Sequence, residues 1–278
     1  RKRYSYGKNY LWGIETVKKL VDEFDKLSNQ ICTVGLGIPG FSSNETGLVT
    51  NAHSMWLNDK PFKKDLEIAL NRKVKLMNDA NCFTLSEAID GAGKDYQSIF
   101  GIIVGTGFGG ALSYKKEIIE GANQIAGDWG HQPLPYPTKE ELETKINCPS
   151  MNCGRPLCAE QFMSGIGFKD VFNQKHNTNF SSEEIVKLDL DGDSRANLEL
   201  SLYEDRMARL MAVMIGIFDP DAIILGGGMS NIDRLYKNIP ALIPKYTFSN
   251  KVITKVIKNF HGDSSGVRGA AWLWNDAT

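Results

Sequence analysis

The sequence predicts a mixed α/β fold, and two patterns carry this prediction. Short apolar runs rich in β-branched residues alternate with segments whose apolar residues recur at the helical period. Such alternation is typical of α/β proteins, and a chain of 278 residues can bury a substantial core.

The first part of the chain predicts an N-terminal small α/β domain over residues 1–97. The composition turns to glycine, lysine, aspartate and glutamine at 91–97, so we place a domain boundary and hinge there. The expected elements are, in order, a helix at 12–27, a strand at 31–37, a helix at 61–70, a strand at 74–77 and a helix at 80–89.

The second part predicts a larger C-terminal α/β domain over residues 98–265. A C-terminal helix at 266–278 is expected to pack back on the first domain. The expected elements of the second domain are a strand at 98–104, strand pairing within 102–114, an irregular segment at 130–160, helices at 182–187 and 197–218, and a strand at 222–225.

Composition excludes several classes of protein. The chain has 32 basic and 33 acidic residues, so no global field favours nucleic acid or an anionic membrane. Its longest apolar runs, such as residues 211–218, are too short to cross a bilayer. Five cysteines are a sparse, odd set that suits a reducing compartment. We therefore expect a cytoplasmic protein without a membrane or nucleic-acid partner.

Two glycine-rich turns follow predicted strands. The dinucleotide fingerprint requires a helix directly after its turn, whereas residues 111–116 predict a second strand, so the first turn joins a hairpin. Glycine lets the backbone approach a phosphate closely, although a turn without a ligand explains each run as well. A polar segment at 230–237, predicted to be helical, follows the second run. The two runs contain Gly105, Thr106, Gly107, Gly109 and Gly110, and Gly226, Gly227 and Gly228.

Asp79 lies where a predicted strand gives way to a predicted helix. The helix dipole and free amides there favour an ionised carboxylate, which can accept a proton near neutral pH. The alternative is a simple helix N-cap. The presence of two candidate phosphate turns in the same chain favours the catalytic interpretation.

One histidine and three cysteines form a candidate zinc site. They are His131, Cys148, Cys153 and Cys158, which include a Cys-x4-Cys pair. Reduced thiols beside a core histidine are the alternative.

Several motifs occur in the order found in the ROK sugar kinases, and the chain resembles that family over its whole length. The motifs are Pro39-Gly40, Asn78-Asp79-Ala80-Asn81, Gly105-Thr106-Gly107, Asp128-x-Gly130-His131, Cys153-Gly154-x3-Cys158-x-Glu160 and Gly226-Gly227-Gly228. The resemblance implies the actin and hexokinase type of ATPase fold, which is ribonuclease H-like, with two α/β domains around a cleft. It also implies use of ATP with Mg²⁺.

The resemblance implies a role for each matching residue. Asp79 would be the catalytic base. The glycine-rich turns would bind ATP, and a structural zinc would be held by His131, Cys153, Cys158 and Cys148, the last in place of a family cysteine that is Met151 here. The sugar would contact Asn51, Asn78, Asp128, His131 and Glu160, where Asp128 stands at a position that is usually glutamate.

Residues 51–62 and 261–274 look most like the bacterial fructokinases that also act on mannose. We therefore expect phosphorylation of fructose, with Trp56 filling space beside the sugar. The alternatives are an N-acetylglucosamine kinase and a sugar-responsive transcriptional repressor of the same family. The family's D-x-G-G-T phosphate loop does not precede Trp12, so we expect a truncated sequence. The sequence leaves open whether the protein forms a homodimer.

Overall fold

The computed structural model describes residues 9–144, 146–149, 153–249 and 251–274. The chain divides into two compact units. Unit 1 is Arg1–Cys82 with Gly266–Thr278, and unit 2 is Phe83–Ser265. The division falls within helix α3 (Asp79–Ile89). The domain boundary expected at residues 91–97 stays a prediction.

The described residues of unit 1 form two small sheets and the three helices α1, α2 and α10. Strands β1 and β4 pair in parallel, and β2 and β3 pair antiparallel. The elements are α1 (Tyr10–Ser28), β1 (Val34–Ile38), β2 (Phe41–Ser42), β3 (Val49–Thr50), the 3₁₀ turn η1 (Met55–Leu57), α2 (Phe62–Leu70), β4 (Val74–Asn78) and α10 (Ser265–Trp272).

Local hydrogen bonds set the ends of the first elements. The Asn9 side chain accepts a bond from the amide of Trp12, so α1 begins earlier than its apolar pattern indicates. The first strand was expected from residue 31 but begins at Val34. The reason is that the Cys32 amide donates to Asp25, and its carbonyl accepts from Arg72.

Helix α10 is tied to strands β1 and β4 by backbone contacts. A Cβ atom at Gly35 would lie 1.9 Å from the carbonyl oxygen of Ala270, so only glycine allows this approach. The Trp274 indole donates to the carbonyl of Val34 at 2.8 Å, and Lys75 Nζ donates to the carbonyl of Leu273 at 2.8 Å. The C-terminal segment therefore packs on strands β1 and β4 of unit 1.

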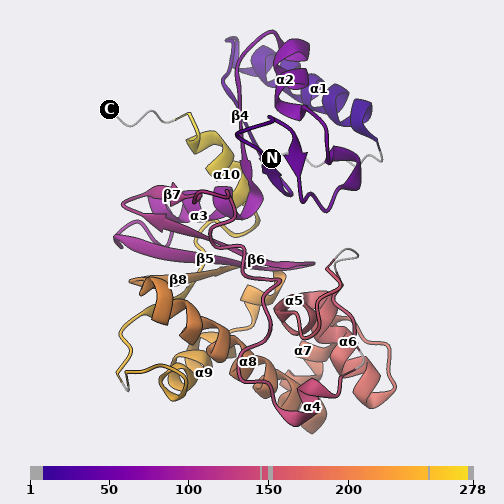
Figure 1. The fold of residues 1–278 in the computed structure, drawn as a ribbon, viewed down its shortest axis with the longest axis vertical. Helices are drawn as coiled ribbons and strands as arrows, with labels where there is room; N and C mark the ends of the chain where they lie inside the picture. The colour runs from indigo at the N-terminus through magenta and orange to yellow at the C-terminus, as the bar shows by residue number, and fades with distance from the viewer. Residues whose placement is uncertain (1–8, 145, 150–152, 250, 275–278) are drawn as a thin grey trace. The chain divides into compact units, whose positions relative to one another are not determined.

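Unit 2 is built on a five-stranded sheet of order β7-β6-β5-β8-β9 (Figure 1). Strands β5 and β6 form the antiparallel hairpin that the glycine turn predicts, and β5, β8 and β9 run parallel. The strands are β5 (Ser98–Val104), β6 (Phe108–Tyr114), β7 (Glu117–Ile119), β8 (Ala222–Gly226) and β9 (Lys255–Lys258).

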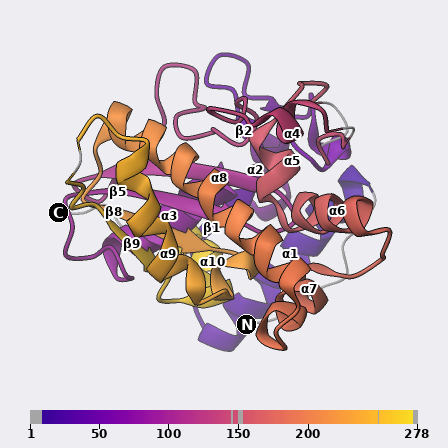
Figure 2. The same cartoon turned by 90° about the horizontal axis from the view of Figure 1, so that it is seen from below.

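Side chains of this sheet alternate between two cores. Phe100 and Ile102 face the larger core, to which α8 contributes Met207, whereas Ile99 packs with Phe83 of α3. Helices α8 (Ser194–Phe218) and α9 (Arg234–Leu242) lie side by side over the sheet (Figure 2). The remaining helices are α4 (Lys139–Leu142), α5 (Ala159–Met163), α6 (Gly165–His176) and α7 (Ser182–Leu190).

The helix expected at residues 230–237 begins later than predicted. A 3₁₀ turn, η2 (Gly228–Asn231), comes first, and α9 begins only at Arg234. The Ser230 hydroxyl donates to the carbonyl of Gly227 at 2.6 Å, and the Asn231 amide donates to that of Gly228 at 3.2 Å. These local bonds hold the tight turn and delay the helix.

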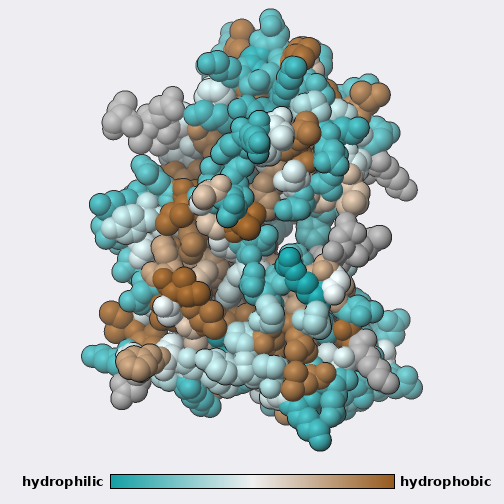
Figure 3. Space-filling model, in the orientation of Figure 1, coloured by the Kyte–Doolittle hydropathy of each residue, from teal (hydrophilic) through white to brown (hydrophobic). Residues whose placement is uncertain are grey.

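Within the described residues, no helix combines the length and the apolar character needed to span a bilayer. On the face shown in Figure 3, apolar side chains occur in separate groups among polar ones.

A buried ion cluster joins α4 to α8. The Glu141 carboxylate is 3% exposed and accepts bonds from Arg206 Nε at 2.8 Å and from Arg209 Nη2 at 2.7 Å. Arg206 also donates to the buried Glu199 at 2.8 Å. Burial alone would raise the pKa of Glu141, but hydrogen bonds from Arg209, the Thr138 amide and Arg206 outweigh it and lower the pKa to about 2.

This shift makes the Glu141 contribution to stability depend on pH. A carboxyl whose pKa is lowered by folding stabilises fully above its ordinary pKa of 4.5 and loses that effect as the pH falls through about 2. Glu141→Gln should therefore lower the free energy of unfolding by on the order of 3 kcal/mol near neutral pH. The deficit should shrink steadily below about pH 4, which urea unfolding at several pH values can measure. A deficit that stayed constant down to about pH 2 would contradict this assignment.

Candidate active site and metal cluster

The junction of β4 and α3 places Asn78 and Asp79 in different roles. Asn78 Oδ1 accepts bonds from the amides of Ala80 at 2.9 Å and Asn81 at 3.3 Å, so Asn78 caps the helix. Its Nδ2 donates to the carbonyl of Gly40 at 3.1 Å. Capping therefore does not depend on Asp79, whose side chain is exposed at the first residue of the helix.

The surroundings of Asp79 act on its pKa in both directions. Crowding by protein atoms raises the pKa of this carboxyl, whereas the Ala80 amide and the charge of His53 lower it. The Ala80 amide donates to Asp79 Oδ1 at 2.9 Å. The side chain stands at the first residue of the helix, where the helix dipole favours the charged carboxylate.

Asn51 begins a looped segment of unit 1. It is exposed and has a left-handed backbone with φ 56°, and Asn58 holds the loop by bonding both the amide and the carbonyl of Ala52. The Trp56 ring points into the unit's own core. A Cβ atom at Gly13 would lie 2.8 Å from this ring, and the Phe62 ring meets it edge-on at 6.5 Å.

The two glycine runs lie at the same edge of the sheet in unit 2. Strands β5 and β8 are parallel neighbours with Ile103 opposite Gly226, so both runs leave the sheet from carboxyl ends. A Cβ atom at Gly227, where φ is 83°, would lie 2.4 Å from the carbonyl oxygen of Val104. By contrast, Cβ atoms at Gly105 and Gly228 would meet no atom within 4 Å, so ligand-sized groups can approach the backbone there.

Gly109 and Gly110 of the first run differ in their surroundings. Gly109 is open like Gly105, whereas a Cβ atom at Gly110 would meet the Phe100 ring at 2.7 Å. Thr106 is exposed at the tip of the hairpin.

Glu160 joins the hairpin turn to the cysteine cluster. Its carboxylate is 2% exposed and accepts a bond from the amide of Phe108 at 3.1 Å. The Cys148 thiol donates to the other oxygen at 3.6 Å. A Cβ atom at Gly107 would lie 3.1 Å from this carboxylate, so Glu160 stands directly beside the turn.

The segment from Asp128 to His131 is anchored by its middle residues. Trp129 is buried between Phe100 and Phe108, with ring centroids 4.8 and 5.1 Å away. A Cβ atom at Gly130 would lie 1.8 Å from the carbonyl oxygen of Phe108, so this position must be glycine. Asp128 is left exposed, and His131 is half-buried.

Four side chains converge into a candidate metal cluster. The ligand atoms of His131, Cys148, Cys153 and Cys158 all lie within 4.8 Å of one another. His131 Nδ1 is 3.4 Å from the Cys158 sulfur and 4.0 Å from that of Cys148. Burial raises the pKa of the Cys158 thiol to about 11. Met151 lies outside the described residues.

This donor set fits zinc. Tetrahedral zinc with bonds of about 2.0–2.3 Å separates its ligands by roughly 3.3–3.8 Å, which is close to the distances found here. One imidazole and three thiols are a donor combination that structural zinc takes. The residues therefore fit a structural metal, and Cys148 can supply the fourth ligand.

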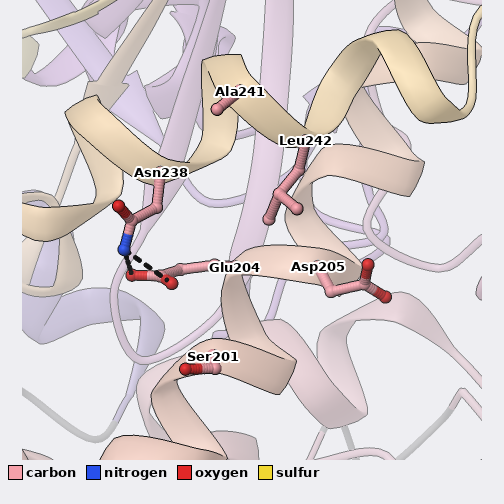
Figure 4. Close-up of a pocket in the computed structure, with 6 residues that line it drawn as sticks. All are labelled: Ser201, Glu204, Asp205, Asn238, Ala241 and Leu242. Atoms are coloured by element: carbon pink, nitrogen blue, oxygen red, sulfur yellow. Dashed lines mark hydrogen bonds between the residues drawn. The ribbon is translucent and has the colours of Figure 1, made fainter.

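A shallow pocket elsewhere in unit 2 is a poor candidate for catalysis. It lies between α8 and α9 and is lined by Ser201, Glu204, Asp205, Asn238, Ala241 and Leu242 (Figure 4). Asn238 Nδ2 donates to both oxygens of Glu204 at 3.0 Å, and Arg234 Nε donates to the same carboxylate at 2.6 Å. The Glu204 carboxylate of this pocket is therefore already hydrogen-bonded within the protein.

Glu141, Arg206 and Arg209 were not predicted from the sequence. One signal was available, because Thr138-x-x-Glu141 has the form of a capping box and the structure shows both of its hydrogen bonds. The contact of Glu141 with Arg209, 68 residues away, has no local signature.

Glycine turns beyond the carboxyl ends of neighbouring parallel strands are typical of α/β proteins that bind phosphorylated ligands. The model of the ROK family matches residues 7–277, and the chain belongs to this family. It is 37% identical over 260 residues to the N-acetyl-D-glucosamine kinase of Vibrio cholerae, which covers 94% of this chain and 86% of the relative. It is 36% identical over 263 residues to that of Haemophilus influenzae, with the same coverage.

The structure is similar to that of a ROK hexokinase from Thermus thermophilus. The TM-score is 0.82 at 22% identity, with 97% of this chain and 87% of the other covered. This confirms both the α/β class and the expected actin and hexokinase type of fold.

Proposed function

We propose that this chain transfers the terminal phosphoryl group of ATP to N-acetylglucosamine. That it is a sugar kinase of the ROK family follows from the family match and from the names of its relatives. The substrate is the alternative that the sequence analysis left open. It is supported chiefly by 37% identity to an N-acetyl-D-glucosamine kinase over 94% of the chain.

The steric argument for fructose is weaker than the sequence indicated. It assumed that Trp56 occupies space beside the sugar, where an acetamido group would need room. The ring instead packs against Gly13 and Phe62 within unit 1. The preference for fructose therefore rests only on the resemblance of residues 51–62 and 261–274.

Asp79 is the proposed general base. Phosphoryl transfer requires a sugar hydroxyl in line with the terminal phosphate and a group that takes the hydroxyl proton. Support for Asp79 comes from its exposed carboxylate at the start of α3 and from Asn78, which caps the helix in its place. Asn78 would then act mainly by fixing the backbone on which Asp79 stands.

The proposed sugar ligands are Asn51, Asn78, Asp128, His131 and Glu160. The bond of Glu160 to the Phe108 amide supports a sugar site next to a phosphate site, because that amide belongs to the hairpin carrying the glycine turn. Hydrogen bonds from buried groups to sugar hydroxyls also give such sites their specificity.

The nucleotide is proposed to lie along the edge of the sheet where both glycine runs emerge. The open space beside Gly105, Gly109 and Gly228 supports this placement, since it lets phosphate groups approach the chain closely there. Mg²⁺ would accompany the phosphates and offset their charge.

The substrate assignment predicts a preference that can be measured. On the full-length protein, kcat/KM for N-acetylglucosamine should exceed that for fructose by at least about tenfold, because a site that bonds the acetamido group leaves polar groups unpaired with a sugar that lacks it. A coupled assay of ADP release with both sugars measures the ratio. A preference for fructose would restore the original expectation, and phosphorylation of neither sugar would contradict the proposed function.

The cysteine cluster is proposed to bind one structural zinc. The metal would hold together the segment that carries His131 and the start of the helix that carries Glu160. Elemental analysis should find about one zinc per chain, and Cys148→Ser should lower zinc affinity. Cys32→Ser, outside the cluster, is the matched control and should keep the metal. Full retention of zinc by Cys148→Ser would show that the fourth ligand lies elsewhere.

A further inference from the structure

The buried ion cluster of unit 2 holds the chain segment that connects two of the candidate zinc ligands. This segment runs from His131 to Cys148 and contains the short helix α4, and its residue 145 lies outside the part of the chain that the structure describes. Glu141 of α4 is fixed by Arg206 and Arg209 of α8, and all three side chains are at most 5% exposed.

Arg209 binds this segment at a second point. Its Nη1 donates to the carbonyl oxygens of Pro135 and Tyr136, each at 2.8 Å, and to Glu141 Oε2 at 3.1 Å. Tyr136 has a left-handed backbone with φ 47°, a conformation that is unfavourable for a residue with a bulky side chain. One guanidinium therefore stabilises a strained stretch and the helix that follows it.

The start of the segment is fixed by backbone pairing. The amide of Leu134 donates to the carbonyl of Leu157 at 2.8 Å, and Pro133 forms a bridge with Cys158. This pairing sets His131 beside Cys158. Cys148 follows α4, so its position depends on where α4 is held.

Stability alone is a weak explanation for such a cluster. Removing several charges from water is costly, and well-packed apolar residues often stabilise a fold as well as a buried ion pair does. Directional bonds to two carbonyls and a carboxylate give Arg209 a geometric specificity that an apolar side chain lacks.

We propose that Glu141, held by Arg206 and Arg209, is a positioning residue for the metal, because it keeps the segment between His131 and Cys148 in the conformation that brings both ligands to the zinc. The inference rests on the zinc site proposed above. It adds that affinity for the metal is set in part by residues that do not touch it, as outer hydrogen bonds do in other metal sites.

The test compares metal binding by three variants of the whole chain. Glu141→Gln removes the charge at constant size, and Arg209→Lys keeps the charge but loses the forked geometry. Glu204→Gln is the matched control. Glu204 lies on α8 and is as buried as Glu141, but it bonds Arg234 and Asn238 of α9 (Figure 4). Zinc affinity is measured by competition with a chelator, and the visible spectrum of the cobalt-substituted protein reports the ligand geometry.

Glu141→Gln and Arg209→Lys should each weaken zinc binding by about 10- to 100-fold, with an altered cobalt spectrum, while Glu204→Gln binds like the wild type. A purely structural role would lower the melting temperature of the metal-free protein and leave affinity and spectrum unchanged, which would overturn the inference. The inference would also fail if the first two variants were unfolded without metal while the control stayed folded. A wild type that binds no zinc would overturn the zinc site itself.

Discussion

Asp79→Asn should lower kcat for phosphorylation of the sugar by about two to four orders of magnitude, the usual contribution of a positioned general base. Asparagine keeps the size of the side chain and one acceptor oxygen but cannot accept the hydroxyl proton. Sugar binding should therefore change little. The surroundings raise the pKa of Asp79 and so disfavour its charge, which means that the neutral amide should not destabilise the fold.

The measurement is steady-state kinetics, together with calorimetric titration of the sugar. Asp233→Asn is a suitable control, because Asp233 also stands at the start of a helix, is exposed and has no role in the proposed site. A kcat for Asp79→Asn within about tenfold of the wild type would remove Asp79 from the mechanism.

Gly269→Ala should lower the free energy of unfolding by about 3 kcal/mol or more, near the upper end of what overpacking costs. A Cβ atom at Gly269 would lie 1.7 Å from the carbonyl oxygen of Cys82 and 2.4 Å from its carbonyl carbon. Both are backbone atoms of α3, so relief would require α10 or α3 to move. Urea unfolding followed by circular dichroism measures the effect.

Gly266→Ala provides the matched control in the same helix. A Cβ atom there would meet nothing within 4 Å. Alanine should therefore be neutral or stabilise α10 by up to about 1 kcal/mol, because it restricts the unfolded chain. Equal effects of the two substitutions would show that the close approach of α10 to Cys82 is not maintained in solution.

The elements with strong local signals were predictable from the sequence. The hairpin around residues 105–107 followed from the absence of a helical pattern after the glycines, and the structure pairs Val104 with Phe108 there. Element ends were less predictable, because side-chain caps such as Asp193 decide them. Asp193 accepts bonds from the amides of Arg195 and Ala196, which starts α8 earlier than its apolar pattern does.

Features that depend on distant contacts were not predictable. Strand β9 has only four residues, two of them lysines, and is defined by its pairing with β8. From the sequence, the Trp56 ring was expected beside the sugar. No local pattern shows that it packs over Gly13 instead. The residues of the candidate site, by contrast, could be predicted from the sequence, because they occur in motifs with recognisable spacing.

The division of unit 1 into two stretches of chain has a consequence for how the protein is made. The bond from the Trp274 indole to the Val34 carbonyl joins residues 240 positions apart, and between them lies the whole of unit 2. A ribosome releases β1 and β4 long before α10 emerges, so their final packing must wait until α10 has been made. Unit 2 is continuous and can fold first. The newly made chain should therefore pass through a stage in which unit 2 is ordered while the surface of β1 and β4 that α10 contacts is still open to chaperones.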